Sequence, residues 1–242
     1  MLNVGVMDDG AFIPTDEGSG QGSVCSPILA NIYMHYVLVY WHRECIAKYL
    51  RGESGLVTYA DDFVVCFQYK SDAEVYYEHL KRRMGRFGLT LEESKTRLIE
   101  FGRFAAENNR KRGKGEPETF TFPGFTHYCS TSRNGKFRVK RKTSQKKFRK
   151  KLKEIRQELK RMYDWKPEAI IDKLNRTLRG YDQYYSITDN IFSVGRFHNE
   201  VMKSLFWMLN RRSQRKSYTW DSFNELLKYH PLLPAKIRVS LY

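Results

Sequence analysis

The fold is decided by residues 55–67, which read Gly55-Leu56-Val57-Thr58-Tyr59-Ala60-Asp61-Asp62-Phe63-Val64-Val65-Cys66-Phe67. β-Branched and aromatic residues dominate on both sides of the two aspartates, as they do in β-strands. In a continuous strand, successive side chains point to opposite faces of the sheet. At a tight turn both carboxylates can face one site, so we expect a β-hairpin with Asp61 and Asp62 at its bend.

Two adjacent carboxylates repel each other unless a cation neutralises them, and hard oxygen ligands favour magnesium. A pair of magnesium ions that stabilises the attacking and leaving oxygens is typical of polymerases. The alternative interpretation is an ordinary polar turn, because Asp is common in turns. An isolated Asp-Asp pair is more often such a turn, so the neighbouring motifs must decide.

The charge of the chain is distributed unevenly. The net charge is +16 over 242 residues. Residues 1–130 contain 15 Lys and Arg against 17 Asp and Glu, whereas residues 131–242 contain 28 against 10. This asymmetry indicates a near-neutral catalytic part and a part that binds a polyanion. Nucleic acid is the first polyanion we expect, and an acidic membrane surface is the weaker alternative.

Several classes of protein are disfavoured. No apolar run approaches the ~20 residues of a membrane span, and residues 1–9 lack the basic and apolar regions of a signal peptide. The cysteines have no Cys-x-x-Cys spacing, which argues against a zinc site and against a disulfide framework. They are Cys25, Cys45, Cys66 and Cys129. We expect a soluble, cytoplasmic protein with reduced thiols.

The first half of the chain begins with a short predicted hairpin at residues 4–15. Glycines at 18, 20 and 22 precede Ser26-Pro27, a pair typical of a helix start. The apolar run Ile28–Leu50 predicts a buried helix.

A second helix is expected from Ser71 to about Phe87, ended by Gly88. Residues 89–101 lead into a predicted strand, residues 103–119 read as an exposed loop, and residues 120–128 return to a strand-like pattern.

The second half changes in character after Asn134-Gly135, a strong hairpin signal, so we place a domain boundary between residues 135 and 136. Helical stripes of apolar residues follow. They are Phe148, Leu152, Ile155, Leu159 and Met162; Ile171, Leu174, Leu178, Tyr181 and Tyr185; and Phe197, Val201, Leu205 and Met208.

The face opposite the first stripe is almost entirely basic. It carries Lys146, Lys147, Arg149, Lys150, Lys151, Lys153 and Arg156. A basic face can simply be solvated, but solvated faces usually mix both signs, and contact with a nucleic-acid backbone is favoured. The aromatic residues Trp165, Tyr184, Tyr185 and Trp207 interleave with basic residues, which suits RNA, although core packing is the more common role for most of them.

The ordered motifs resemble those of group II intron reverse transcriptases (intron-encoded maturases). Tyr59-Ala60-Asp61-Asp62 resembles the active-site box of that family. Gly20-Gln21-Gly22 with Ser26–Tyr33 is similar to the family's block that lines the nucleotide and template site, with Gly20 where the family usually has Pro. Lys95 precedes residues similar to the family's sixth block.

Two further motifs extend the resemblance. Phe122-Pro123-Gly124-Phe125 looks like the family's Phe-Leu-Gly-Phe box, which grips the primer end; Pro123 replaces Leu and stiffens the turn. Leu178–Tyr185 resembles the signature of the family's thumb (domain X). The resemblance therefore implies an α+β fold, with a partial polymerase palm in residues 1–135 (an antiparallel sheet with packed helices) and a helical, basic thumb in residues 136–242.

The resemblance implies RNA-directed DNA synthesis on an RNA template with a DNA primer. Asp61 and Asp62 would be catalytic and hold Mg²⁺, and Lys95 would hold the nucleotide's phosphates or protonate the pyrophosphate; a solvated surface Lys is the alternative. Residues expected at the nucleotide site are Gly20, Gln21, Gly22, Tyr59 and Ala60. Expected nucleic-acid contacts are Phe122, Gly124, Phe125, Lys140, Arg141, Lys142, Lys146, Lys147, Lys150, Arg179, Arg211 and Arg212.

The family's first catalytic Asp lies on a strand before the Gly-Gln-Gly block, and this motif is absent from the 19 residues before Gly20. We therefore expect a separate N-terminal fingers/palm fragment to complete the enzyme. A non-catalytic maturase that binds intron RNA and assists splicing is the alternative. A generic basic RNA-binding protein with a chance Asp-Asp hairpin is a third, weaker interpretation.

Overall fold

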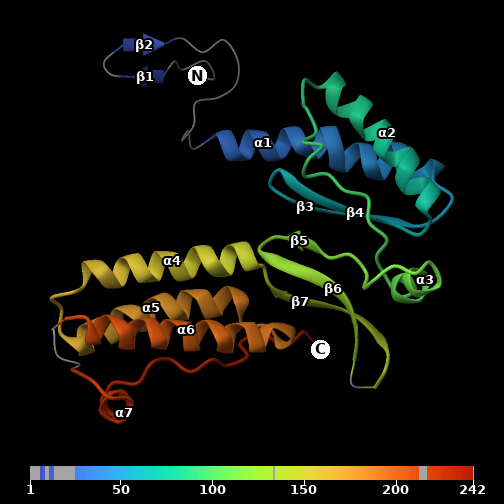
Figure 1. The fold of residues 1–242 in the computed structure, drawn as a ribbon. Helices are drawn as coiled ribbons and strands as arrows, with labels where there is room; N and C mark the ends of the chain where they lie inside the picture. The colour runs from blue at the N-terminus through green and yellow to red at the C-terminus, as the bar shows by residue number, and fades with distance from the viewer. Residues whose placement is uncertain (1–5, 9–10, 14–24, 133, 213–216, 242) are drawn as a thin grey trace. The chain divides into compact units, whose positions relative to one another are not determined.

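The structure is a computed structural model that describes residues 6–8, 11–13, 25–132, 134–212 and 217–241 (Figure 1). The chain divides into two compact units, Met1–Glu100 and Phe101–Tyr242. Each unit combines helices with a small antiparallel sheet. The α+β class expected from the sequence is confirmed.

The described residues of the first unit form two hairpins and four helical segments. Its elements are β1 (Val6–Asp8), β2 (Ala11–Ile13), α1 (Ser26–Met34), the π-helix η1 (His35–Ile46), the 3₁₀-helix η2 (Ala47–Tyr49), β3 (Ser54–Tyr59), β4 (Asp62–Phe67) and α2 (Lys70–Arg86). β1 and β2 pair antiparallel, and so do β3 and β4. Both hairpins were expected from the sequence.

The core of this unit lies between one face of the β3–β4 hairpin and the helices η1 and α2, which run over it (Figure 1). Strand alternation puts Leu56 and its partner Val65 on that face. The buried helical residues are Val37, Leu38, Trp41, Ile46, Tyr76, Leu80 and Met84. This packing fixes which face of the hairpin remains open to solvent.

The expectation that Ile28–Leu50 forms a buried helix is wrong for its first half and correct for only one face of its second half, where Tyr36 and Tyr40 remain exposed. α1 buries none of its residues, and Ile28 is 60% exposed. An apolar run predicts a helix with a surface that is stable when buried. The element that buries it lies elsewhere in the sequence, and the run itself does not identify that element. The helix also begins at Ser26 itself, with Cys25 in the capping position, so Ser26 is not the N-cap.

α2 confirms the helix expected before Gly88. Gly88 has φ +66°, and the N–H of Leu89 donates to the carbonyl of Met84 at 3.0 Å, which closes the helix end. Tyr69 rather than Ser71 occupies the N-cap position. The strand expected within residues 89–101 does not form. The N–H groups of Lys95 and Thr96 both donate to the carbonyl of Glu92, which makes a turn there.

The second unit contains a three-stranded sheet and a helical bundle. Its elements are α3 (Ala105–Lys111), β5 (Phe120–Phe122), β6 (Phe125–Thr131), β7 (Phe137–Thr143), α4 (Gln145–Arg161), α5 (Pro167–Tyr185), the 3₁₀-helix η3 (Thr188–Asn190), α6 (Ile191–Asn210) and α7 (Trp220–Tyr229). The loop expected at 103–119 was wrong in part, because it contains α3. Buried Ala105 and Asn109 anchor that helix, and the Asn109 amide donates to the carbonyl of Gly115 at 3.1 Å.

The sheet order is β5-β6-β7, antiparallel throughout. Pro123-Gly124 forms the first turn, with Gly124 at φ +82°. The second turn contains Gly135 at φ +73°, as its Asn-Gly signal indicates. The boundary expected between residues 135 and 136 falls in this second turn, inside the second compact unit. As a boundary between functional modules it stays a prediction.

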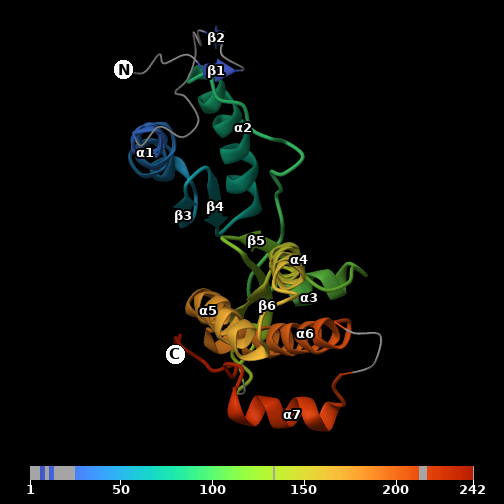
Figure 2. The same ribbon diagram turned by 90° about the vertical axis from the view of Figure 1, so that its left-hand side faces the viewer.

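The helical stripes expected in the second half are confirmed as the core of the bundle. Every residue of the first and third stripes is buried, and only Tyr185 of the second is partly buried. Figures 1 and 2 show α7 on the side of α6 that faces away from α4. Its Phe223 is fully buried against this core.

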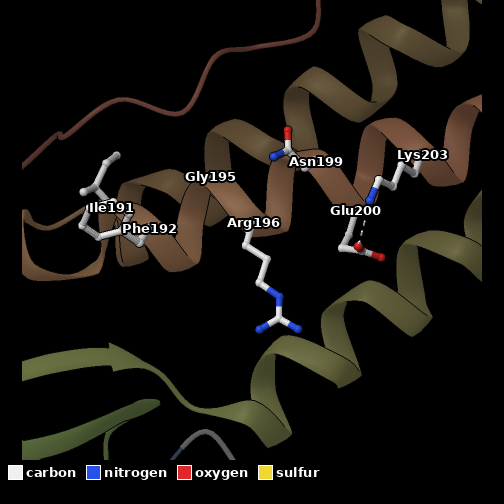
Figure 3. Close-up of a pocket in the computed structure, with 7 residues that line it drawn as sticks. All are labelled: Ile191, Phe192, Gly195, Arg196, Asn199, Glu200 and Lys203. Carbon is white, nitrogen blue, oxygen red and sulfur yellow. Dashed lines mark ion pairs between the residues drawn. The ribbon is translucent and has the colours of Figure 1, made fainter. Parts of the chain in front are cut away.

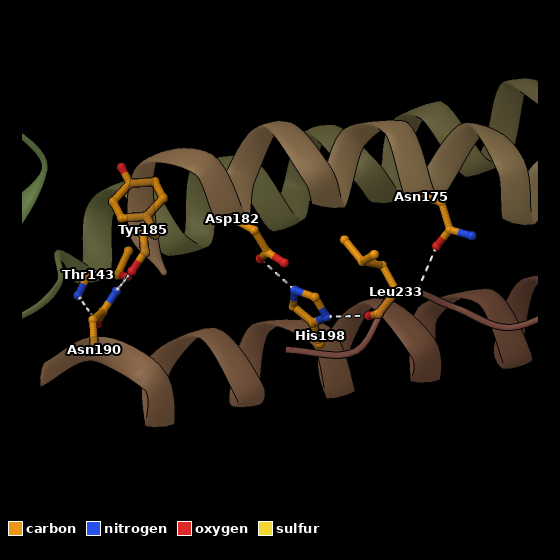
Figure 4. A network of polar contacts seen from close by, with 7 residues as sticks. All are labelled: Thr143, Asn175, Asp182, Tyr185, Asn190, His198 and Leu233. Atoms are coloured by element: carbon orange, nitrogen blue, oxygen red, sulfur yellow. Dashed lines mark hydrogen bonds and ion pairs between the residues drawn. The ribbon is translucent and has the colours of Figure 1, made fainter. Parts of the chain in front are cut away.

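Polar contacts fasten the segment 231–241 to the bundle (Figure 4). His198 on α6 lies between Asp182 Oδ1 and the carbonyl of Leu233, and each ring nitrogen is 2.8 Å from its partner. The Asn175 side chain accepts from the N–H of Leu233 and donates to the carbonyl of Pro231. This segment therefore acts as a strap across α5 and α6.

Candidate carboxylate site and nucleic-acid interface

The bend between β3 and β4 is a two-residue loop. Tyr59 pairs with Asp62, so the bend is formed by Ala60 and Asp61, and Asp62 is already the first residue of β4. The expected hairpin forms, but its bend lies one residue earlier than the expected Asp61-Asp62. Ala60 has φ +51°. A side chain in this left-handed region costs roughly 1–2 kcal/mol, and such strained positions cluster at functional sites. The hairpin thus holds Ala60, the residue before Asp61, in a conformation that the backbone alone does not prefer.

Asp61 and Asp62 are both exposed. Strand alternation puts Asp62 on the hairpin face that also carries Tyr59 and Val57. Those two side chains are 60% and 57% exposed. The carboxylates therefore lie at the end of an open, partly apolar face rather than in a closed cavity.

The carboxylate pair fits a magnesium ion in ligand chemistry but supplies only part of a ligand set. Mg²⁺ requires near-octahedral oxygen coordination. Across the part of the chain that the structure describes, no group of three or more His, Cys, Asp or Glu side chains could hold a metal ion. Asp61 and Asp62 can supply two oxygens, and the remaining ligands must come from water, substrate or another polypeptide.

Lys95 lies in the turn that follows α2, and its side chain is exposed. The pKa of the Glu92 carboxyl is lowered, first by the hydrogen bond from the Ser94 hydroxyl and then by the charge of Lys95. The expected nucleotide-site residues Gly20, Gln21 and Gly22 lie outside the described residues.

The turn of the expected primer-grip motif is seated on α5. The Tyr184 hydroxyl donates to the carbonyl of Pro123 at 2.6 Å. A Cβ added to Gly124 would lie 3.0 Å from the Tyr185 hydroxyl oxygen, so the close approach requires glycine. The buried Phe125 ring stacks on Tyr184 with a centroid distance of 5.5 Å. Phe125 thus anchors the turn, whereas half-buried Phe122 keeps part of its surface open.

α4 and α5 together line a groove of about 520 Å³. α4 contributes Lys147, Lys150, Lys151 and Glu154, and α5 contributes Arg176, Thr177, Gly180, Tyr181, Tyr184 and Tyr185. Glu154 is the only carboxylate among these lining residues, and it pairs with Lys151 at 3.3 Å. A cationic groove beside an exposed tyrosine, Tyr184, suits a nucleic-acid backbone with a stacked base. We call it the α4–α5 groove.

The sequence reasoning identified Lys147, Lys150 and Tyr184 but missed Arg176, Thr177 and Gly180. A signal was present, since Arg176, Gly180 and Tyr184 are spaced four residues apart and share one helix face. Nothing within 4 Å would meet a Cβ at Gly180.

Of the other expected nucleic-acid contacts, Lys146, Arg179 and Arg211 are exposed. On β7, Lys140 and Lys142 share one face and Arg141 lies on the other. Lys142 Nζ lies 5.2 Å from the centroid of the Tyr128 ring.

Arg212 has a role inside the bundle. Its guanidinium donates to the carbonyl of Trp165 at 2.7 Å and to that of Met162 at 3.3 Å. It therefore satisfies backbone groups around the end of α4. Core packing was the more common role expected for the aromatic residues that interleave with basic ones. Three of them are exposed instead: Trp165, Tyr184 and Trp207.

The comparison with protein families settles the classification. A family model described as "Reverse transcriptase (RNA-dependent DNA polymerase)" matches residues 3–127, more than half of the chain. The chain belongs to the reverse transcriptase family. A second model, "Group II intron, maturase-specific domain", matches residues 145–229. The two matches confirm the resemblance to group II intron reverse transcriptases and maturases.

No curated protein matches the chain in a sequence search. Within the described parts of this chain, no helix is long and apolar enough to cross a membrane. The maturase match covers α4 to α7, which includes both walls of the α4–α5 groove.

Proposed function

We propose that this chain is part of an RNA-directed DNA polymerase of a group II intron, and that it works with a separate fingers/palm fragment. The observation that carries the proposal is the pair of exposed carboxylates at a strained two-residue bend, within the part of the chain that matches the reverse transcriptase family. Asp61 and Asp62 would hold Mg²⁺, which when bound stabilises charge on the reacting oxygens during nucleotidyl transfer.

The partner fragment is supported by what the first unit leaves uncovered. The carboxylate pair is an incomplete ligand set, and the adjoining sheet face exposes Val57 and Tyr59. α1 exposes Ile28 and Ile32 in the same unit. Soluble domains rarely leave such residues grouped without a partner. A fragment that covers them would also be placed to supply further oxygen ligands to the metal.

The remaining residues take supporting roles in the proposal. Lys95, Tyr59 and Ala60 contact the incoming nucleotide, together with Gly20, Gln21 and Gly22. The turn with Phe122 and Gly124 contacts the DNA primer, and the α4–α5 groove contacts the RNA template. This role on intron RNA is consistent with a location in the bacterial cytoplasm.

The test is primer extension on an RNA template with Mg²⁺, with the chain alone and with an added fingers/palm fragment. We expect synthesis only with the fragment. Asp61→Asn should reduce the rate of DNA synthesis by about 100-fold or more. Even the loss of a residue that only hydrogen-bonds to a metal ligand lowers metal affinity or activity by about 10–100-fold. The control is Glu74→Gln, which replaces an exposed carboxylate on α2. Full activity of the Asp61→Asn protein would refute the catalytic assignment.

A non-catalytic maturase is the second candidate, favoured by the overlap of the α4–α5 groove with the maturase match. In that case Asp61→Ala leaves assistance of intron splicing intact, and Lys147→Glu with Lys150→Glu abolishes it. A splicing assay with intron RNA measures both. Equal loss of splicing from the control Lys70→Glu would show that the effect does not come from the groove.

A further inference from the structure

α6 presents a second surface that neither the carboxylate site nor the α4–α5 groove uses. Its exposed residues are Phe192, Arg196, Asn199, Lys203 and Trp207. Their spacings of four, three, four and four residues put them on one face of the helix. We call this face the α6 stripe. At a rise of 1.5 Å per residue it extends over about 22 Å.

The ends of the stripe are aromatic and strongly exposed. Phe192 is 89% exposed and Trp207 is 59% exposed. Beside Phe192 the surface is hollow, with a volume of about 570 Å³, and Gly195 contributes to it because no side chain fills the space (Figure 3). A flat ring beside an open hollow can accept a second planar group against its face.

The middle of the stripe is cationic and polar. Arg196 extends toward α4, and its guanidinium carbon lies 5.8 Å from the centroid of the Phe148 ring (Figure 3). The adjacent carboxylate of Glu200 is already neutralised, because it pairs with Arg156 at 3.3 Å and with Lys203 at 3.8 Å. The stripe therefore offers positive charge, one neutral amide and two rings, with no carboxylate among its own members.

We propose that the α6 stripe binds a short segment of single-stranded RNA. Phe192 and Trp207 stack on bases, Arg196 and Lys203 contact phosphates, and the Asn199 amide donates and accepts hydrogen bonds at a base edge. Aromatic rings for the bases combined with cations for the phosphates are the usual means of holding single strands. The proposal rests on the proposed role of the chain in RNA binding and assigns that role a second site.

RNA fits this surface better than a protein partner does. A protein-binding helix face typically carries a contiguous apolar centre with charges at the rim. Here the order is reversed, because the charges lie in the centre and the rings at the ends. The stripe also shares no residue with the α4–α5 groove, so the two surfaces can be altered separately.

The experiment measures fluorescence anisotropy of a labelled twelve-nucleotide uridine RNA with the full-length chain. Phe192→Leu with Trp207→Leu keeps apolar volume but removes both rings, and we expect binding to weaken at least about tenfold. Arg196→Gln with Lys203→Gln should weaken it to a similar extent. The matched controls on α7 are Tyr229→Leu, an 82% exposed ring, and Lys228→Gln, and both should bind as the unaltered chain does.

Wild-type affinity in the double-leucine protein would overturn the proposal, as would equal losses in the α7 controls. Loss of self-association or of vesicle binding in that protein, with RNA affinity unchanged, overturns it as well. Absence of primer extension has no bearing on the outcome, because the anisotropy assay requires neither metal nor a fingers/palm fragment. Melting temperatures confirm that each variant is folded.

Discussion

At the scale of single residues, the most informative position is Ala60. It is the only described non-glycine residue with a positive φ, and it directly precedes Asp61 in the bend. Any residue other than glycine is strained there, and a β-branched residue is strained most. The conformation nevertheless presents Asp61 at the bend, which gives a reason for keeping the strain.

Substitutions at Ala60 should follow this strain. Ala60→Val should lower the free energy of unfolding by about 1 kcal/mol or more. Ala60→Gly should leave it within about 0.5 kcal/mol, because relief of strain offsets the greater freedom of the unfolded chain. Urea denaturation monitored by tryptophan fluorescence measures both. A valine variant as stable as the unaltered chain would contradict the assigned backbone conformation.

At the scale of elements, the strap 231–241 depends on His198. A neutral imidazole has one N–H, but both ring nitrogens face acceptors at 2.8 Å. The imidazole therefore joins the carbonyl of Leu233 to the fully buried carboxyl of Asp182. Oδ2 of Asp182 has no hydrogen-bond partner among the described atoms, so this carboxylate depends on His198.

Replacement of His198 should therefore release the strap. His198→Leu should cost about 3 kcal/mol of unfolding free energy, because it leaves a buried carboxylate unpaired. Adding Asp182→Leu should recover part of the loss, since removing both partners avoids the unpaired charge. Hydrogen exchange across residues 231–241 reports the release. A double variant no more stable than His198→Leu alone would rule out this coupling.

The sequence predicted the periodic elements and the β3–β4 hairpin, because alternation and helical spacing are local signals. It placed the bend one residue too late, since Asp62 lies in β4. It did not predict that α1 would be exposed or that Arg212 would serve the end of α4. Those outcomes depend on which elements pack against each other. Local sequence patterns do not show which residues far away in the sequence a side chain will contact. The same holds for Phe125, whose motif suggested a ligand contact and whose ring fills the space beside Tyr184.

At the scale of the whole molecule, the two compact units differ in the sign of their net charge. Residues 1–100 hold 10 Lys and Arg against 14 Asp and Glu, and residues 101–242 hold 33 against 13. The second unit therefore carries the whole positive excess of the chain. Binding of a polyanion to it releases counterions and must weaken as salt increases.

RNA affinity should accordingly fall by about 100-fold or more between 50 and 200 mM salt if five or so phosphates are contacted. Lys147→Glu with Lys150→Glu should make the slope of log affinity against log salt shallower by about one per lost contact. Arg82→Glu on α2 is the control in the first unit. Filter binding at four salt concentrations measures the slopes, and an unchanged slope in the groove variant would exclude contact with phosphates there.

In the β3–β4 hairpin, each strand pairs with no other strand of the described residues than its partner. Among those residues, each strand therefore has one outer edge to which no further strand is hydrogen-bonded. Residues 54–67 contain no Lys, Arg or Pro, the residues that usually guard such an edge against pairing with another chain. The hairpin therefore offers an edge to which a strand of another chain can pair. If the proposed fragment paired there as the chain is synthesised, it would block edge-to-edge pairing between copies of the chain, which leads to aggregation.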